Sequence, residues 1–504
     1  MGRILRVLWF ALLLGCGASR ADAVDLVWAS GSDVTGANAL DATSGTSRAM
    51  ADHNSEGLTR LVHGKLTPWL ASSWRIIDDH TWEFSLRPNV KFHNGEPFTA
   101  ESVKATFAAI TDKNNRSPFR TDFTIAREIQ VVDDLTVRIV TIDPQPLMPL
   151  ILFRLNMIPP KYFASVGAAG YRRHPVGTGA YRFVEFVRDD HITMEAFKDY
   201  WGGPQHFQRI THRPILEPAA RVAALLTGEI DFAAEVPSEL ESMFAGRRDI
   251  RLIKKPNGRV LYLNLNNKRP SYPTNKREVR EALSYSIDRE ALASELLPGI
   301  GRASVWQTWG TLGEDPDAKP LPYDPQRSRA LLAQAGYPNG LDIVMDVPTN
   351  RYMKDRDIAN AMVAQMKEAG FRVTLRTAEW GAYMQRIYAA DTAPLSMFSF
   401  DGGTFDPHQF NRSYLFSDGM YSQVQFKEFD ELLKRIEAEM NPDKRRALIV
   451  EQRKLQDRLI PFVYIVQLGI IGAVNDKLKD WDMQADERYS WVRNSITIPR
   501  DASR

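Results

Sequence analysis

The first 23 residues restrict what the rest of the chain can be. A short basic region, Arg3 and Arg6, precedes an apolar stretch from Val7 to Leu14, and small residues then end in Ala21-Asp22-Ala23. This order predicts a secretory signal peptide over residues 1–23, cleaved after Ala23. The apolar stretch is shorter than the roughly 20 residues that cross a bilayer. We therefore expect an exported, periplasmic protein.

Cysteine usage adds a second restriction. Cys16 is the single cysteine of the sequence. The segment Leu13-Leu14-Gly15-Cys16 resembles a lipoprotein processing site, so a lipid anchor at Cys16 is the alternative to cleavage after Ala23. Leu14 is bulky for such a site. Cleavage after Ala23 leaves no thiol, which excludes disulfides, thiol catalysis and thiolate metal sites, so stability must come from an apolar core.

Charge and length exclude several classes of protein. Removing Arg3, Arg6, Arg20 and Asp22 with the signal leaves equal numbers of basic and acidic residues. A neutral balance argues against a nucleic-acid partner and against a polybasic membrane anchor. The 504 residues predict about three domain-sized units. The 44% hydrophobic content is typical of an ordered globular chain.

The pattern of expected elements indicates a mixed α/β fold. Residues 81–86 alternate apolar and polar, as a half-buried strand does, and Asn94-Gly95 is a strong turn signal. Further on, a strand at 341–347, a helix at 355–369 ended by Gly370, and a strand at 371–375 form a strand–helix–strand unit.

Motifs of catalysis are missing from the sequence. It contains no G-x-S-x-G, H-E-x-x-H, Walker loop or G-x-G-x-x-G. The nine histidines are scattered, so we expect no metal and no cofactor. Carboxylates are abundant, which leaves a periplasmic hydrolase open as an alternative. A long exported chain without catalytic spacing favours a binding function.

Several segments resemble one known family. They are LTPWLASSW at 66–74, TWEFSLR at 81–87, VKFHNG at 90–95, VGTGAY at 176–181, GEID at 228–231, VREALSYSIDR at 279–289 and the stretch from Tyr323-Asp324-Pro325 to Gly336. In this order they resemble the extracellular solute-binding proteins of family 5, the oligopeptide, dipeptide and nickel class that serves ABC importers. Ser102 departs from the family pattern, which has Asp there.

The resemblance implies a two-lobed periplasmic binding protein fold, α/β, with mixed sheets, flanking helices, a hinge between the lobes and an extra domain in lobe I. Mapped onto this chain, residues 24–53, 176–268 and 476–504 would form domain I, residues 54–175 domain II, and residues 269–475 domain III. The apolar runs 260–265 and 463–471 are expected to be the two hinge crossings. A small solute, in the first place a peptide, would be bound by a monomer that docks on ABC permease and ATPase subunits, without catalysis.

A segment near residue 400 carries the main expectation about the site. Peptide-binding relatives hold the peptide amino group with an acid in a W-x-x-D-x-x-D-P segment. Here residues 400–408 read FDGGTFDPH. Asp406 takes the Asp-Pro position, Phe400 takes the aromatic position, and Gly403 falls where the acid stands. Asp401, two residues away, is expected to substitute for that acid. The departure keeps a non-peptide solute open: an opine, a sugar conjugate or a metal chelate.

The remaining candidates also come from the resemblance. Trp380 falls at an aromatic wall of the pocket, and Asp33 at a strand end that contacts the ligand backbone. Arg386 and Arg351 are candidates for a ligand carboxylate, and His408 for a metal chelate. Ordinary core, capping or loop roles are the alternatives for each of these residues.

Overall fold

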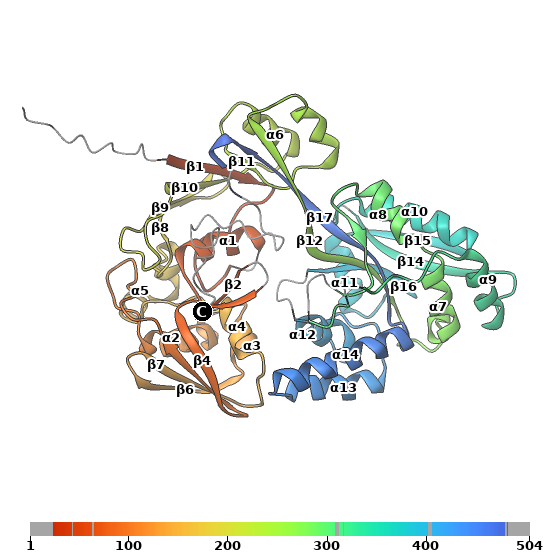
Figure 1. Cartoon of the computed structure of the whole chain (residues 1–504), viewed down its shortest axis with the longest axis horizontal. Coiled ribbons are helices and arrows are strands. Elements are labelled where there is room, and N and C mark those ends of the chain that lie inside the picture. Colours follow the sequence, from red (N-terminus) through yellow and green to blue (C-terminus); the bar gives the residue numbers. More distant parts are fainter. Residues whose placement is uncertain are drawn as a thin grey trace, which may run out of the picture.

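The computed structural model describes residues 24–42, 44–62, 65–307, 312–315, 317–349, 351–401, 406–478 and 481, with the backbone alone at Asp401. The expected signal peptide therefore lies outside the described residues. We refer to residues 24–58 and 174–249 as the first body, to residues 59–173 as the insert, and to residues 266–461 as the second body. Figure 1 shows the first body and the insert on one side and the second body on the other.

The first body and the insert alternate short strands and helices. The first body contains β1 (Val24–Ser30), α1 (Gly45–Asn54), β8 (Tyr181–Val187), β9 (His191–Ala196), β10 (Phe207–Pro214), α6 (Pro218–Leu226), β11 (Phe232–Ala233) and the 3-10 helix η3 (Ser238–Phe244). The insert contains β2 (Thr59–Val62), β3 (Lys65–Pro68), β4 (Ala71–Asp78), β5 (Thr81–Leu86), α2 (Ala100–Thr111), η1 (Lys113–Asn115), α3 (Arg120–Phe123), β6 (Ala126–Asp133), β7 (Thr136–Thr141), α4 (Met148–Ile151), η2 (Leu152–Arg154) and α5 (Pro160–Arg173).

The second body follows one long strand and precedes another. After β12 (Ile250–Leu265) come η4 (Pro273–Asn275), α7 (Arg277–Tyr285), α8 (Arg289–Leu296), β13 (Arg302–Ala303), α9 (Pro325–Gln334), β14 (Leu341–Thr349), α10 (Asp355–Glu368), β15 (Phe371–Glu379), α11 (Trp380–Tyr388), β16 (Leu395–Asp401), α12 (His408–Phe410), the π-helix η5 (Asn411–Leu415), α13 (Lys427–Ala438) and α14 (Pro442–Leu459). β17 (Phe462–Asn475) and η6 (Asp476–Leu478) close the described chain. The expected strand–helix–strand unit is confirmed as β14, α10 and β15.

One sheet runs through both bodies. Its strand order is β15-β14-β16-β12-β17-β11-β1-β10-β9-β8, and β13 adds to β17. Within it, β14, β15 and β16 are parallel, as are β10, β1 and β11. A separate four-stranded antiparallel sheet, β4-β5-β7-β6, belongs to the insert. The two-bodied α/β architecture expected from the resemblance is thus present.

Strands β12 and β17 are the two crossings between the bodies. They pair with each other along nearly their whole length, Ile250 to Pro256 against 469–475 and Val260 to Asn264 against 462–467. Pairing is interrupted between Pro256 and Val260. Proline has no amide hydrogen to donate to a ladder, and an extra segment in one strand bends it. The interruption therefore gives the strand pair a defined place to bend, between the two bodies (Figure 1).

A buried carboxylate ties the insert to the first body. Glu56 accepts hydrogen bonds from Nε1 of Trp69 at 2.6 Å, the hydroxyl of Tyr200 at 2.7 Å, Oγ1 of Thr178 at 2.9 Å and Nε1 of Trp201 at 3.0 Å. Burial raises the pKa of Glu56, and the bonds from the two indoles and the phenol act against that shift. Segments far apart in the sequence thereby converge on one side chain.

No helix in the described part of the chain is long and apolar enough to cross a membrane. The same residues contain no group of three or more His, Cys, Asp or Glu side chains that could hold a metal ion.

We predict that Gly469→Ala destabilises the strand pair. A Cβ at Gly469 would lie 2.3 Å from the carbonyl oxygen of Ile300 and 2.7 Å from its Cβ, so β17 or its neighbour must move. Overpacking of this kind costs about 1–3 kcal/mol. The readout is the thermal unfolding midpoint. Gly381→Ala is the control, because a Cβ there meets no atom within 4 Å; equal midpoints for the two variants would contradict the prediction.

Candidate ligand-binding site

The carboxyl ends of parallel strands gather the candidate residues of the second body on one edge. β14, β15 and β16 end at Thr349, Glu379 and Asp401. Arg351 follows the first of these ends and Trp380 the second, which brings them together although they are 29 positions apart. Ligands of open α/β sheets bind at such edges, because the loops that leave the strands converge there.

The first body presents the matching edge. Its parallel strands β1, β10 and β11 end at Ser30, Pro214 and Ala233. Asp33 lies in the loop after β1. Glu235 follows β11 in a left-handed backbone conformation, φ 54°, and its Oε2 accepts a hydrogen bond from the amide of Gly31 at 3.1 Å. A non-glycine residue at positive φ is uncommon and often marks a functional position.

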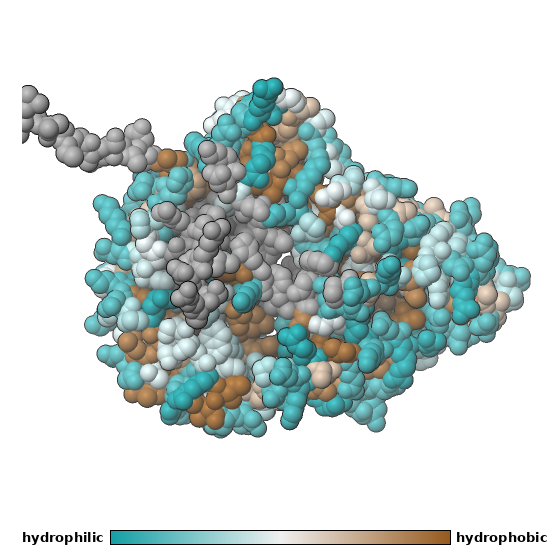
Figure 2. All heavy atoms as spheres, in the orientation of Figure 1, coloured by the Kyte–Doolittle hydropathy of each residue, from teal (hydrophilic) through white to brown (hydrophobic). Residues whose placement is uncertain are grey.

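An ion pair shows that the two edges approach each other. Nζ of Lys354, on the loop after β14, contacts a carboxylate oxygen of Glu239, on η3 after β11. The ammonium lowers the pKa of Glu239, and the carboxylate raises the pKa of Lys354. The segments after β11 and β14 are therefore in contact across the two bodies. Figure 2 shows mostly hydrophilic residues on the outer faces of both bodies.

Trp380 and Arg351 form a cationic and aromatic surface on the second body. The guanidinium carbon of Arg351 lies 4.8 Å from the centre of the Trp380 ring, and that ring lies 6.1 Å from the ring of Tyr352. Tyr352 is fixed from behind, because its hydroxyl accepts a hydrogen bond from the amide of Ser399 at 3.3 Å. Arg259 reaches the same strand, and its Nη1 donates to Oγ of Ser399 at 3.1 Å. Arg259, like Glu235, was not singled out from the sequence.

Asp33 holds backbone of its own body. Its Oδ1 accepts from the amide of Val34 at 2.7 Å, and its Oδ2 accepts from the amide of Asp189 at 2.8 Å. Asp189 is a left-handed turn residue between β8 and β9. Both carboxylate oxygens thus fix a loop and a turn at the sheet edge.

Phe400 belongs to the core of the second body. It is 7% exposed, and its ring packs 5.4 Å from Phe410 and 5.6 Å from Tyr414. Asp401 ends β16 opposite Arg259 in the β12 register. The side chain of Asp401 and the whole of Gly403 lie outside the described residues. The expectation that Asp401 substitutes for the acid missing at Gly403 therefore stays a prediction.

Asp406 is held by a buried guanidinium. Its two carboxylate oxygens accept from Nη1 and Nη2 of Arg445, on α14, at 2.6 and 2.9 Å, and its Oδ1 also accepts from the amide of His408 at 2.9 Å. Both partners of the ion pair are less than 8% exposed. Asp406 therefore anchors the segment to α14.

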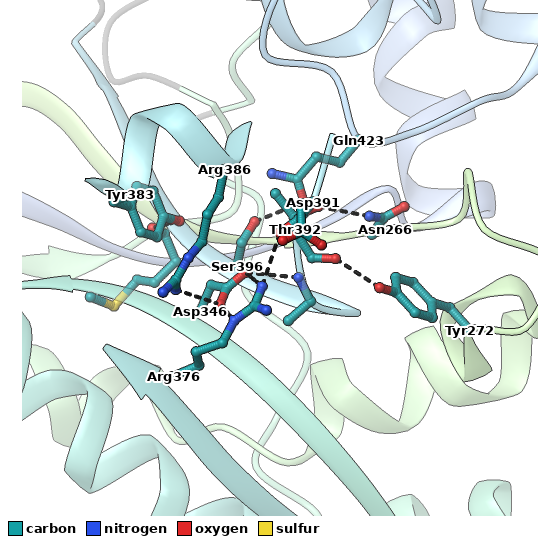
Figure 3. A network of polar contacts seen from close by, with 12 residues as sticks. Asn266, Tyr272, Asp346, Arg376, Tyr383, Arg386, Asp391, Thr392, Ser396 and Gln423 are labelled. Carbon is teal, nitrogen blue, oxygen red and sulfur yellow. Dashed lines mark hydrogen bonds and ion pairs between the residues drawn. The ribbon is translucent and has the colours of Figure 1, made fainter. Parts of the chain in front are cut away.

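His408 and Arg386 point to groups of the protein. Nδ1 of His408 lies 3.7 Å from a carboxylate oxygen of Glu437, and burial lowers the pKa of His408. Nη1 of Arg386 lies 3.7 Å from buried Asp346, which also accepts from Arg376 and from the amide of Ala393 (Figure 3). Among the described residues, Nη1 of Arg386 has no hydrogen-bond partner. The network joins β14 and β15 to α11 and to the segment before β16, inside the second body.

A serine and a histidine lie together in the first body. Oγ of Ser30 is 2.9 Å from Nε2 of His212, and both side chains are fully buried. Burial lowers the pKa of His212 to about 4, and among the described residues its Nδ1 has no hydrogen-bond partner. A nucleophile pair needs access to substrate and an oriented base. Neither is present at Ser30 and His212.

The sheet edges, the two crossing strands and the space between two bodies define a solute-binding protein that closes on its ligand. The family model for bacterial extracellular solute-binding proteins, family 5, matches residues 65–422. This chain belongs to that family, whose members are the binding components of ABC importers rather than enzymes.

Individual relatives agree with this assignment. The glutathione-binding protein GsiB of Pectobacterium atrosepticum is 30% identical over 382 residues, which cover 73% of each chain. GsiB of Escherichia coli O157:H7 is 32% identical over 344 residues, 66% of this chain and 65% of its own. The substrate-binding protein CtaP of Listeria monocytogenes superposes with a TM-score of 0.82 at 22% identity, covering 90% of this chain and 94% of CtaP.

We predict that Arg445→Met strongly lowers stability, because it leaves the buried carboxylate of Asp406 without its partner. Breaking one side of a buried pair costs about 3–5 kcal/mol. Chemical unfolding followed by circular dichroism measures the loss. Arg446→Met, at the exposed neighbouring position, is the matched control. Asp406→Leu combined with Arg445→Met should recover part of the loss, and no recovery would show that the pair's charge is not the cause.

Proposed function

We propose that this protein captures a peptide or peptide-like solute between its two bodies in the periplasm and delivers it to the permease and ATPase subunits of an ABC importer. The observation that carries the proposal is the set of charged and aromatic groups on two sheet edges that approach each other. One edge presents the guanidinium and indole of Arg351 and Trp380, and the other presents the carboxylate of Glu235 after β11. Such a space suits a solute with charges of both signs and an apolar part. The name of GsiB, a glutathione-binding protein, supports the class.

The organisation of the chain fits this role. We propose that the lobes are the domains expected from the sequence, with the bend placed at the pairing interruption between Pro256 and Val260. We further propose export through the signal peptide over residues 1–23 and action as a monomer without catalysis. A nucleic-acid partner has no support in the neutral charge balance.

The identity of the solute can be read directly. Protein purified from periplasm without denaturation is extracted, and the released ligand is analysed by mass spectrometry. A ladder of short peptides is the expected result. A single non-peptide mass, such as an opine, a sugar conjugate or a metal chelate, would replace the peptide assignment and would connect the change to Gly403.

We predict that Trp380→Ala weakens solute binding by about 30-fold or more, since truncating a central aromatic contact costs about 2 kcal/mol or more. Titration calorimetry with the released solute measures the affinity. Tyr388→Ala is the matched control, because Tyr388 ends the same helix and is 57% exposed. Unchanged affinity in Trp380→Ala would remove Trp380 from the site.

A further inference from the structure

A pocket lies between the insert and the second body, apart from the two sheet edges. Its volume is about 300 Å³. One wall comes from α3, the loop after it and the segment from Gln145 through α4 to η2 of the insert, and the other from α12 and η5 of the second body. Figure 1 places α3 and α4 beside α12, and Figure 2 shows hydrophobic residues among hydrophilic ones in the lower middle of the same face. This volume and a position between structural units are typical of small-molecule sites.

The lining of this pocket has an apolar floor and a charged rim. The apolar side chains are Phe123, Ile125, Leu147, Leu150 and Ile151, all from the insert. The charged lining residues are Asp122, Arg154 and Arg412; His408 lines the pocket too. Burial lowers the pKa of His408, so this imidazole is neutral at pH 7.

The two guanidiniums come from opposite walls, and each has an acidic neighbour. Nη1 of Arg154 lies 4.0 Å from Asp122, and Nη1 of Arg412 lies 3.3 Å from Asp418. The Arg412–Asp418 pair is more than half exposed, and the Arg154–Asp122 distance is at the limit of an ion pair. Such pairs contribute little, so both guanidiniums retain the capacity to bind another anion. Glu437 lies behind His408 and is not part of the lining.

We propose that this pocket binds a small organic anion, an apolar body carrying one carboxylate, at a site separate from that of the transported solute. The apolar body lies on the leucine and isoleucine floor, and the carboxylate accepts hydrogen bonds from Arg154 of the insert and Arg412 of the second body. Two guanidiniums against one lining carboxylate favour an anion over a cation.

Binding here acts on lobe movement. The two walls belong to two units, and the described chain passes from one to the other through the first body and the crossing strand β12. Met440 of the second body also packs against the hydrophobic cluster of the insert. A ligand that touches both walls favours the lobe spacing at which both contacts are made. The coupling is reciprocal, so the transported solute and the anion change each other's affinity by the same factor.

The test uses 3-phenylpropionate as the probe and 3-phenylpropionamide as its uncharged counterpart, each titrated calorimetrically into the full mature protein. We expect saturable one-to-one binding of the acid and binding of the amide weaker by about tenfold or more, because a charge-assisted hydrogen bond contributes about 1.5–3 kcal/mol. Absence of saturable binding of the acid up to about 10 mM, or equal affinity of acid and amide, would overturn the proposal.

Two variants locate the probe. Arg154→Gln combined with Arg412→Gln should weaken binding of the acid by about tenfold or more, and Arg446→Gln should leave it unchanged. Trp380→Ala should also leave it unchanged, since Trp380 does not line this pocket. If Trp380→Ala no longer bound 3-phenylpropionate and the double variant still did, the probe would lie between the sheet edges. That result would overturn the proposal. The acid–amide comparison on the unaltered protein stands even where the double variant does not fold.

Discussion

The pairing of β12 with β17 is the constraint on which the rest of the structure depends. These two strands continue the sheet from one body into the other, and they are hydrogen-bonded to each other on both sides of the interruption at 256–260. Gln467 fills the interruption: it is fully buried, donates to the carbonyl of Asn257, and accepts from Nε of Arg302 at 2.5 Å. The crossing is therefore paired on both sides of this interruption, and a second register shift follows between Leu261 and Tyr262, so the irregular stretch from 256 to 262 is where the strand pair can bend.

The candidate ligand-binding residues are placed relative to that crossing. Parallel strands on either side end at one edge of the sheet; Arg351, Asp33 and Glu235 lie in the segments after those ends, and Trp380 begins the helix α11 that follows β15. The ion pair of Lys354 with Glu239 joins the two edges without covering them. A sheet shared by both bodies thus allows their edges to approach while each body keeps its own packing.

Buried polar side chains on one face of helix α14 hold neighbouring segments of the second body in place. Arg445 binds Asp406, Gln452 exchanges two hydrogen bonds with Asn411 at 2.7 and 2.9 Å, and Gln456 donates to Gln307 at 3.1 Å. Their spacing of seven and four residues puts them on a single side of a helix. Because these hydrogen bonds are buried, α14 fixes the positions of the segments around 307 and 406–411.

Part of the site was within reach of the sequence and part was not. The strand–helix–strand unit at 341–375 follows from hydrophobic periodicity and capping, which are local properties, and Trp380 was singled out through the family resemblance. The burial of Phe400 and the pairing of Asp406 with Arg445 depend on residues that approach only after folding, with 39 positions separating the latter two. No local pattern separates a carboxylate that binds a ligand from one that binds an arginine of its own chain.

The sequence by itself determined the class: a chain with a predicted signal peptide, without a thiol after residue 16, with equal numbers of basic and acidic residues after residue 23, α/β in its periodicity, and carrying the ordered motifs of one family. The tertiary structure alone decided which partners these charges meet. Asp33, Asp406 and Arg386 contact groups of their own body. Arg351 and Glu235 follow the ends of strands on the two sheet edges, and Arg259 lies opposite the end of β16. The reason is physical. The role of a charged side chain depends on the group that it contacts, and the sheet and the crossing strands bring such groups together from distant parts of the sequence. The local sequence pattern carries no information about contacts over that separation.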